Sequence, residues 1–259
     1  MVGGVRHNFV NDIGDYAKYA LLRALCAVGE GTVRLGVIWY LTSHAEDNND
    51  GRKRAHLLTA GWDDLDPDLL AGMRHIEDSL HSQDQLDVGL IETSGILPPG
   101  TAYFSEPVPR APGTARKRVS ERMAWFDRAR KAMAHCNLVF LDPDNGLEVP
   151  SAPITSPLAN KYATVAEIAA LLEAGSGVVL YQHGSRTPWR QQRENICTRI
   201  ATGTDRDVTI SSLRFGAFGA RAFFCVTVDK ELTAIVQSGF EQLRRRVATW
   251  DKSSYLLIE

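Results

Sequence analysis

Short apolar runs rich in β-branched and aromatic residues recur along the sequence, and segments with helical periodicity separate them. Arg34 to Leu41 (RLGVIWYL) is a run of the kind that is buried on both faces of a parallel sheet, and Asn137 to Leu141 and Gly177 to Tyr181 are further apolar strands. Parallel strands require crossover connections, and the segments between these runs are long enough for helices. The sequence therefore predicts an α/β fold, a three-layer sandwich in which a doubly wound, mainly parallel sheet carries helices on both sides.

The remaining elements follow from periodicity and from the Gly, Pro and capping residues at segment ends. The predicted helices cover Asp15 to Val28, Pro67 to Ser82, Thr114 to His135, Val165 to Glu173, Gln191 to Ile200 and Lys230 to Thr249. The remaining predicted strands cover Val88 to Glu92, Ala102 to Ser105, Val208 to Leu213 and Ala222 to Val228. Because the link between the last two strands is too short for a crossover helix, we expect them to form an antiparallel hairpin. A mainly parallel sheet that ends with an antiparallel strand resembles the plan of class I methyltransferases.

Length and composition favour one domain over residues 1–259, with a helical insertion around 52–87 and a flap around 107–113. Apolar residues make up 44% of the chain and charged residues 23%, which excludes disorder on a large scale. The formal net charge of −2 creates no overall attraction for nucleic acid, so such binding would need a local basic patch. The four cysteines form no CxxC pair, which argues against structural zinc. No signal peptide or membrane-spanning run is present, so we expect a cytoplasmic location and no membrane partner.

Candidate catalytic residues gather in the segment LVFLDPDNGLEV, where Asp142, Pro143, Asp144 and Asn145 directly follow an apolar strand. With Glu148, the two aspartates place three carboxylates within seven residues. Such groups repel one another unless a cation, hydrogen-bond donors or the amino group of a substrate compensates. The structural alternative is an Asx turn at the exit of the sheet.

His183 and Arg186 follow the next strand and should face the same crevice, because open α/β sheets bind ligands at the carboxyl ends of their strands. His183 is therefore a further catalytic candidate, and Arg186 has the charge and planar shape of a phosphate ligand. A hydrogen-bonded structural histidine and a solvated arginine are the alternatives.

The strand end at Asp142-Pro143 resembles motif IV of amino-methyltransferases (D/N-P-P-Y/F), which holds the exocyclic amine of a flipped base. Arg6-His7-Asn8-Phe9, followed by Asp15 and Lys18, resembles the start of the RlmJ family, which methylates N6 of an adenine in 23S ribosomal RNA. The resemblance implies a divergent S-adenosylmethionine-dependent methyltransferase that acts on a base amine in nucleic acid. In this interpretation Asp142 and the Pro143 carbonyl hold the amine, and His7 and Lys18 close the site.

Two further segments are similar to the strands that hold the cofactor in that family. Tyr40-Leu41-Thr42-Ser43-His44-Ala45 is similar to the end of the first strand, and Leu90-Ile91-Glu92 is similar to the second. The resemblance implies that Glu92 binds the ribose of S-adenosylmethionine, while His44 and Tyr40 shape the cofactor pocket.

Departures from the family pattern raise alternatives. Glu46-Asp47-Asn48 stands where the family has Gly-Ala-Gly, and Asp144 and Asn145 replace a proline and an aromatic residue of motif IV. The resulting set of acids suits Mg²⁺ or Mn²⁺ in a metal-dependent nuclease or phosphohydrolase. The metal ligands would then be Asp142, Asp144, Asp47 and Asp50. The DxDNG spelling also resembles motif I of haloacid-dehalogenase-type phosphatases, and a binding module that keeps only the scaffold is a third interpretation.

Two basic segments are candidates for contact with a nucleic-acid backbone. They hold Arg116, Lys117, Arg118, Arg122, Arg128, Arg130 and Lys131 in the first segment and Arg244, Arg245 and Arg246 in the second. Solvated helix faces are the alternative for both.

Overall fold

A mixed sheet forms the centre of the computed structural model, which describes residues 10–29, 31–42, 53–80, 87–110, 112–217 and 219–259. Among these residues seven strands are ordered β2-β1-β3-β6-β8-β7-β9. Their bounds are β1 Leu35–Trp39, β2 Ala102–Phe104, β3 Leu138–Asp142, β6 Gly177–His183, β7 Thr209–Phe215, β8 Arg221–Thr227 and β9 Leu256–Ile258. Strands β2, β1, β3 and β6 are parallel, β8 is antiparallel to both β6 and β7, and β9 is antiparallel to β7. The prediction of a mainly parallel sheet that ends in an antiparallel hairpin is therefore confirmed.

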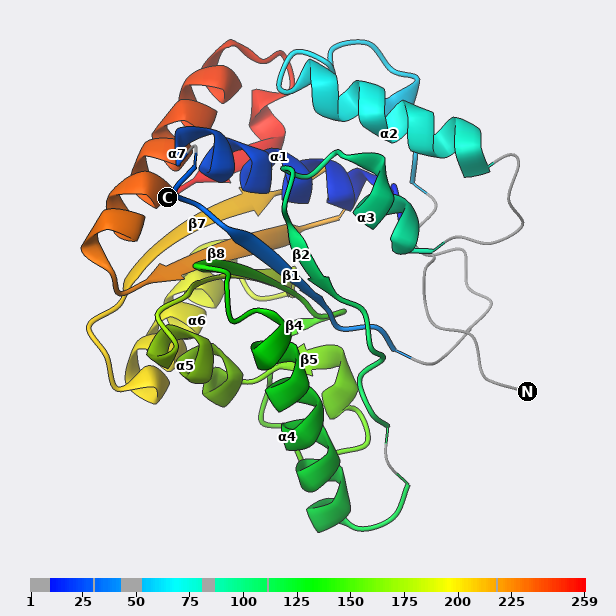
Figure 1. The fold of residues 1–259 in the computed structure, drawn as a ribbon. Coiled ribbons are helices and arrows are strands. Elements are labelled where there is room, and N and C mark those ends of the chain that lie inside the picture. Colours follow the sequence, from blue (N-terminus) through cyan, green and yellow to red (C-terminus); the bar gives the residue numbers. More distant parts are fainter. Residues whose placement is uncertain (1–9, 30, 43–52, 81–86, 111, 218) are drawn as a thin grey trace.

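Helices cover both faces of this sheet (Figure 1). They are α1 Ile13–Val28, α2 Pro67–Leu80, α3 Gly89–Ser94, α4 Ala115–Ala132, α5 Val165–Glu173, α6 Trp189–Thr204 and α7 Lys230–Thr249, with short 3-10 turns at Ala55–Leu57, Ala159–Lys161 and Ser253–Tyr255. Helices α1, α2 and α7 contribute to one apolar cluster, and α4, α5 and α6 contribute to the other. The sheet is thus the middle of three layers, as the alternation in the sequence predicts.

Alternate side chains of β3 pack against the helix layers on the two faces of the sheet. Leu138 and Phe140 belong to the α1 side, whereas Val139 and Leu141 belong to the α4 side. Since successive side chains of a strand point to opposite faces, Asp142 comes next on the α1 side. The last residue of β3 therefore carries its carboxylate toward α1.

Most predicted elements are present, but the predicted strand Val88 to Glu92 is wrong, because α3 occupies this stretch. The Asp87 side chain accepts a hydrogen bond from the Gly89 amide, and Gly95 ends the helix in a left-handed conformation with φ 73°. An apolar run this short has no periodicity that separates a strand from a helix. Strand β9, which pairs along β7, was not predicted.

Between β3 and α5 the chain is largely irregular, apart from the paired short strands β4 (Gly146–Leu147) and β5 (Tyr162–Ala163). In the expected flap, the amide of Val108 donates to the carbonyl of Leu41 at 2.8 Å. None of the helices in the described part of the chain has the length and apolar character that crossing a bilayer requires.

Candidate functional site

The pocket of interest lies where the strand connections diverge. From β1 the chain leads to β2 on one side, whereas from β3 it leads toward β6 on the other, so the crevice beyond these two strands is a topological switch point. A pocket of about 60 Å³ is found there. Its lining residues are Val10, Asp15, Lys18, Tyr19, Trp39, Tyr40, Leu41, Thr42, Val88, Asp142 and Asp144.

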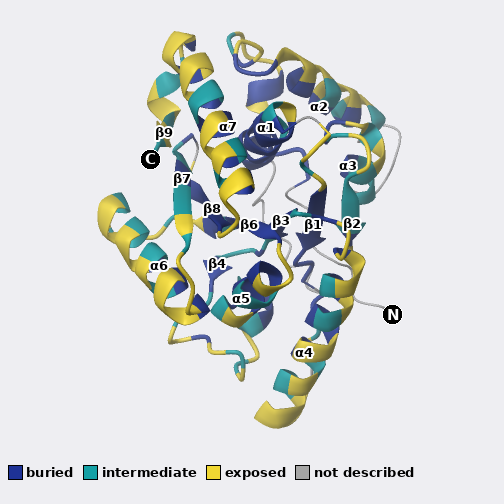
Figure 2. Cartoon of the chain, turned by 60° about the vertical axis from the view of Figure 1, so that its left-hand side comes forward, coloured by how far each residue is buried: buried dark blue, intermediate teal, exposed yellow. Residues whose placement is uncertain are grey.

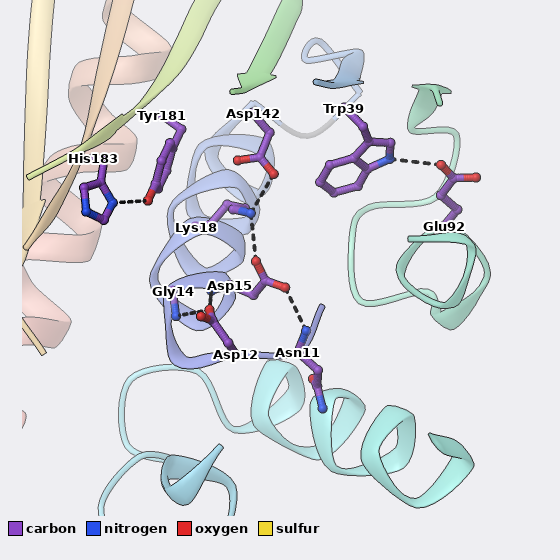
Figure 3. A network of polar contacts seen from close by, with 10 residues as sticks. All are labelled: Asn11, Asp12, Gly14, Asp15, Lys18, Trp39, Glu92, Asp142, Tyr181 and His183. Atoms are coloured by element: carbon purple, nitrogen blue, oxygen red, sulfur yellow. Dashed lines mark hydrogen bonds and ion pairs between the residues drawn. The ribbon is translucent and has the colours of Figure 1, made fainter. Parts of the chain in front are cut away.

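Lys18 on α1 is the centre of this site (Figure 3). Its Nζ lies 2.7 Å from Oδ1 of Asp15 and 2.8 Å from Oδ2 of Asp142. The side chain of Lys18 is only 8% exposed, and that of Asp142 is 17% exposed. Four aromatic rings surround the ammonium with centroids 5.5 to 6.0 Å away, those of Tyr19, Trp39, Phe140 and Tyr181. The rings and the two carboxylates together replace the water that a lysine normally keeps.

The charges of this cluster do not balance, because one ammonium faces two carboxylates. Burial alone would lower the pKa of Lys18, but the attraction of Asp142 and Asp15 outweighs it and raises that pKa above its ordinary value. Burial raises the pKa of Asp142, although Lys18 opposes the shift, and the nearby Asp15 and Asp144 raise it further. Lys18 is therefore permanently charged, while Asp142 accepts a proton more readily than an ordinary aspartate does.

The start of α1 holds Asp15 in place. Asp12 caps the helix by accepting hydrogen bonds from the amides of Gly14 at 2.6 Å and Asp15 at 3.2 Å. Asn11 has a left-handed backbone with φ 67° and donates its amide to Oδ2 of Asp15 at 2.9 Å. The Asn11 side chain in turn donates to the carbonyl of Met73 on α2. The segment Asn11-Asp12 thus uses residues suited to such turns to aim Asp15 at Lys18.

A second polar group lies beside the first. A Cβ placed on Gly14 would lie 2.9 Å from Nε of Arg221, so glycine leaves room for this buried arginine against the start of α1. Burial and then Asp15 raise the pKa of Asp12 to about 6, although Arg221 opposes the shift. Further along β6, the Tyr181 hydroxyl lies 3.3 Å from Nδ1 of His183.

The turn after β3 fixes the remaining motif residues. The hydroxyl of Thr42 donates to Oδ2 of Asp144 at 3.2 Å. The carbonyl of Asn145 accepts from the amide of His183 at 3.2 Å and from the side chain of Gln182 at 3.1 Å. Gly146 follows with φ 106°. Asp144 therefore lines the pocket, while Asn145 acts through its backbone to join the turn to β6.

The expected cofactor residues have definite partners. Glu92, on a helix instead of a strand, accepts hydrogen bonds from Nε1 of Trp39 at 2.9 Å and from the hydroxyl of Ser105. Tyr40 borders the pocket, but its hydroxyl donates to Glu167 at 3.1 Å on the α4 side of the sheet. Trp39 is thus an aromatic wall of the pocket whose indole Glu92 holds in position.

The structure brings together Asp142, Asp144 and Lys18 in one pocket, which Tyr40 also borders. Pro143 is buried, and His183, Asn145 and Glu92 lie nearby without lining the pocket. The expected residues His7, His44, Asp47 and Asp50 lie outside the described residues. Within the described residues no group of three His, Cys, Asp or Glu side chains could hold a metal ion.

Several residues of the site were not predicted from the sequence. Trp39, Tyr19 and Thr42 line the pocket, and Asp12 and Arg221 form the group beside it. The position of Trp39 and Thr42 near the end of the first strand was a usable signal, because ligands bind at that rim. No sequence pattern indicates the approach of Arg221 to α1.

The basic residues of α4 differ in their burial and in their ion pairs. Arg122 is buried and forms an ion pair with Glu167, whereas Arg128, Arg130 and Lys131 pair with acids at the surface. Arg116 is exposed and has no ion pair with any described residue. Only the first part of the helix therefore offers unpaired positive charge.

No protein-family model matches this chain, and no curated protein matches it.

Proposed function

We propose that this protein is an S-adenosylmethionine-dependent methyltransferase that acts on an exocyclic base amine in nucleic acid. The sheet supports the proposal, because β8 runs antiparallel between β6 and β7 beside four parallel strands, which resembles the plan of class I methyltransferases. The pocket at the switch point between β1 and β3 is where such a fold binds its ligands.

The observation that carries the proposal is the environment of the Asp142 carboxylate. Oδ2 is held by Lys18 at 2.8 Å, while Oδ1 has no hydrogen-bond partner among the described residues. An N–H group of an amine that enters the pocket can donate to Oδ1. Because Lys18 fixes the carboxylate through its other oxygen, this acceptor is held in place before the substrate arrives.

The residues of the pocket fit a positively charged cofactor. Asp15, Asp142 and Asp144 contribute three carboxylates against the single ammonium of Lys18, so the pocket has an excess of negative charge. Trp39 and Tyr19 add aromatic faces, which attract sulfonium and ammonium groups. The volume of about 60 Å³ admits one such group beside Asp142 and is smaller than a whole cofactor, for which pockets of roughly 300 Å³ or more are usual.

When it is bound, S-adenosylmethionine supplies an electrophilic methyl group. Asp142 orients the amine by accepting one N–H at Oδ1, which directs the nitrogen lone pair away from the carboxylate. When the amine nitrogen accepts that methyl group it would lose one proton, which Oδ1 of Asp142 would receive. The raised pKa of Asp142 suits this task, because a carboxylate of ordinary pKa is a weaker proton acceptor.

Calorimetry with S-adenosylmethionine and transfer of a labelled methyl group to RNA or DNA test the proposal together. The wild type should bind the cofactor and transfer the label. Asp142→Asn keeps the shape of the side chain but cannot take the proton, so transfer at saturating cofactor should fall about 100-fold or more. The matched control is Asp127→Asn, which changes an exposed aspartate on α4 and should leave both measurements unchanged.

The proposal fails if the wild type binds no S-adenosylmethionine, or if Asp142→Asn transfers the label as fast as the control does. Titration with Mn²⁺ in the same calorimeter separates the hydrolase alternative. Metal binding that disappears in Asp144→Asn, without any cofactor binding, would also overturn the proposal.

A further inference from the structure

The first half of α4 combines features that lie outside the pocket. A groove of about 420 Å³ lies along it, and the lining is mainly apolar. Its lining residues are Ala115, Arg116, Val119, Ser120, Met123 and Thr155. Met123 is 63% exposed, which is unusual for a side chain of this size and polarity. Figure 2 shows that this end of the helix is largely exposed and stands away from the sheet.

The groove is rimmed by positive charge that is only partly neutralised, because Glu121 pairs with Lys117 alone. Arg116, Lys117 and Arg118 occupy the first turn of α4, where no acidic residue is present. Cations at this position oppose the helix dipole, so each costs stability unless an anion lies close by. Arg116 forms no ion pair or hydrogen bond with any described residue. The charge complement of this surface is therefore a polyanion.

Chain segments that border the groove lead to the rim of the pocket. Val108, which leads into α4, is bonded to Leu41 of the pocket rim, and the turn that holds Asp144 leads on to Thr155. Nε of Arg118 joins these two segments by donating to the Thr155 carbonyl at 2.6 Å. Farther along α4, the ring centroids of Trp125 and Tyr40 lie 5.1 Å apart, and Tyr40 borders the pocket. Val119 lies six residues before Trp125, which is about 9 Å along the helix axis.

We propose that this groove, with Arg116, binds unpaired nucleotides that flank the target base. The proposal rests on the proposed function and specifies its substrate as single-stranded nucleic acid. A duplex presents phosphates but hides its base faces, whereas an unpaired strand offers both phosphates and apolar faces, and the groove has a partner for each. Arg116 contacts the backbone, and Met123 and Val119 pack against a base or sugar.

Fluorescence anisotropy with a short labelled single-stranded RNA of mixed sequence, measured without cofactor across a range of salt concentrations, tests the surface. Arg116→Ala should weaken binding and lower the slope of log K against log salt by about one. The control is Arg246→Ala, which removes an exposed arginine on α7 that has no partner among the described residues, and it should leave the slope unchanged.

Met123→Ser tests the apolar half of the proposal. It should weaken single-strand binding about five-fold without changing the salt slope, and it should not affect binding of the same sequence as a duplex. The surface is overturned if Arg116→Ala behaves like the control, if a duplex binds as tightly as the single strand, or if an acidic peptide competes equally well. If the wild type binds the single strand but transfers no methyl group, only the proposed function fails, because the binding assay contains no cofactor.

Discussion

Lys18 sets the electrostatics of the pocket at the level of a single residue. Its ammonium neutralises part of the charge of Asp15 and Asp142, and its position holds both carboxylates on one side of the crevice. A buried ion pair of this kind adds little net stability, but loss of one partner is costly because a buried charge then remains uncompensated. Lys18 therefore matters more for the positions of the two carboxylates than for the net stability that the ion pair adds to the fold.

Replacing Lys18 by Met should destabilise the protein by about 3–5 kcal/mol, because the side chain keeps its size while two buried carboxylates lose their counter-charge. Urea denaturation at neutral pH measures the change. Adding Asp142→Asn to this variant should recover part of the loss, since one of the two charges is removed. Lys117→Met, at an exposed pair with Glu121, is the control and should change stability by less than about 1 kcal/mol. Equal effects of the two lysine variants would contradict the account.

Asp12 gives a prediction about pH. The pKa of Asp12 is raised from 3.8 to about 6 by burial and by Asp15, so the folded protein keeps a proton between these values that the unfolded chain releases. The stabilising contribution of Asp12 to the free energy of unfolding is fully present below about pH 4 and is lost as the pH rises through 6. Asp12→Asn retains the helix cap without the charge, so it should gain roughly 3 kcal/mol over the wild type between pH 4 and pH 7.

Denaturation of wild type and Asp12→Asn across this pH range provides the measurement. The difference between the two proteins isolates Asp12 from other titrating groups. A constant difference at every pH would show that burial does not raise this pKa.

The residues of the site were predictable to different degrees. Asp142 and Asp144 could be found because they end an apolar strand, and Lys18 was expected through a family resemblance in the N-terminal segment. The contact between Lys18 and Asp142 joins residues 124 positions apart, and the packing of α1 on the sheet creates it. No local sequence pattern indicates the role of Arg221, because that role depends on Gly14 of α1.

At the scale of elements, the turn between β3 and β4 depends on Gly146. Its φ of 106° is strained for any other residue, and an added Cβ would meet the side chain of Gln182. Gly146→Ala should therefore cost about 3 kcal/mol in unfolding free energy. Gly175→Ala is the matched control, because its φ is 86° but a Cβ there would meet nothing within 4 Å. Chemical denaturation should show a smaller loss for the control, and equal losses would rule out the contact with Gln182.

Element prediction succeeded where local signals agree. The helices Val165 to Glu173 and Lys230 to Thr249 have the predicted bounds, since Thr164 with Glu167 forms a capping box and Asp229 caps α7. The stretch that contains α3 was mistaken for a strand because its helix is only six residues long. Strand β9 depends on pairing with β7, which no local pattern announces.

For the whole molecule, the layered arrangement predicts an order of hydrogen exchange. Phe140, Val179 and Phe224 lie on central strands and are fully buried, whereas most residues from Ala115 to Ser120 at the start of α4 are exposed. Exchange followed by mass spectrometry should be slowest in β3, β6 and β8 and fastest, among the described helices, in α4 from Ala115 to Ser120. Protection of this part of α4 equal to that of β3 would contradict the arrangement.

The enclosure of Lys18 also makes this residue a sensor. Its amine borders the pocket but is held by two carboxylates and surrounded by four rings, so an acylating reagent modifies it only when its contacts with Asp15 and Asp142 open. Exposed lysines such as Lys131 are acylated from the folded state. The difference between the acylation rates of Lys18 and of the exposed lysines, measured by mass spectrometry, reports how often these contacts open. Any molecule that occupies the pocket should slow the acylation of Lys18 further.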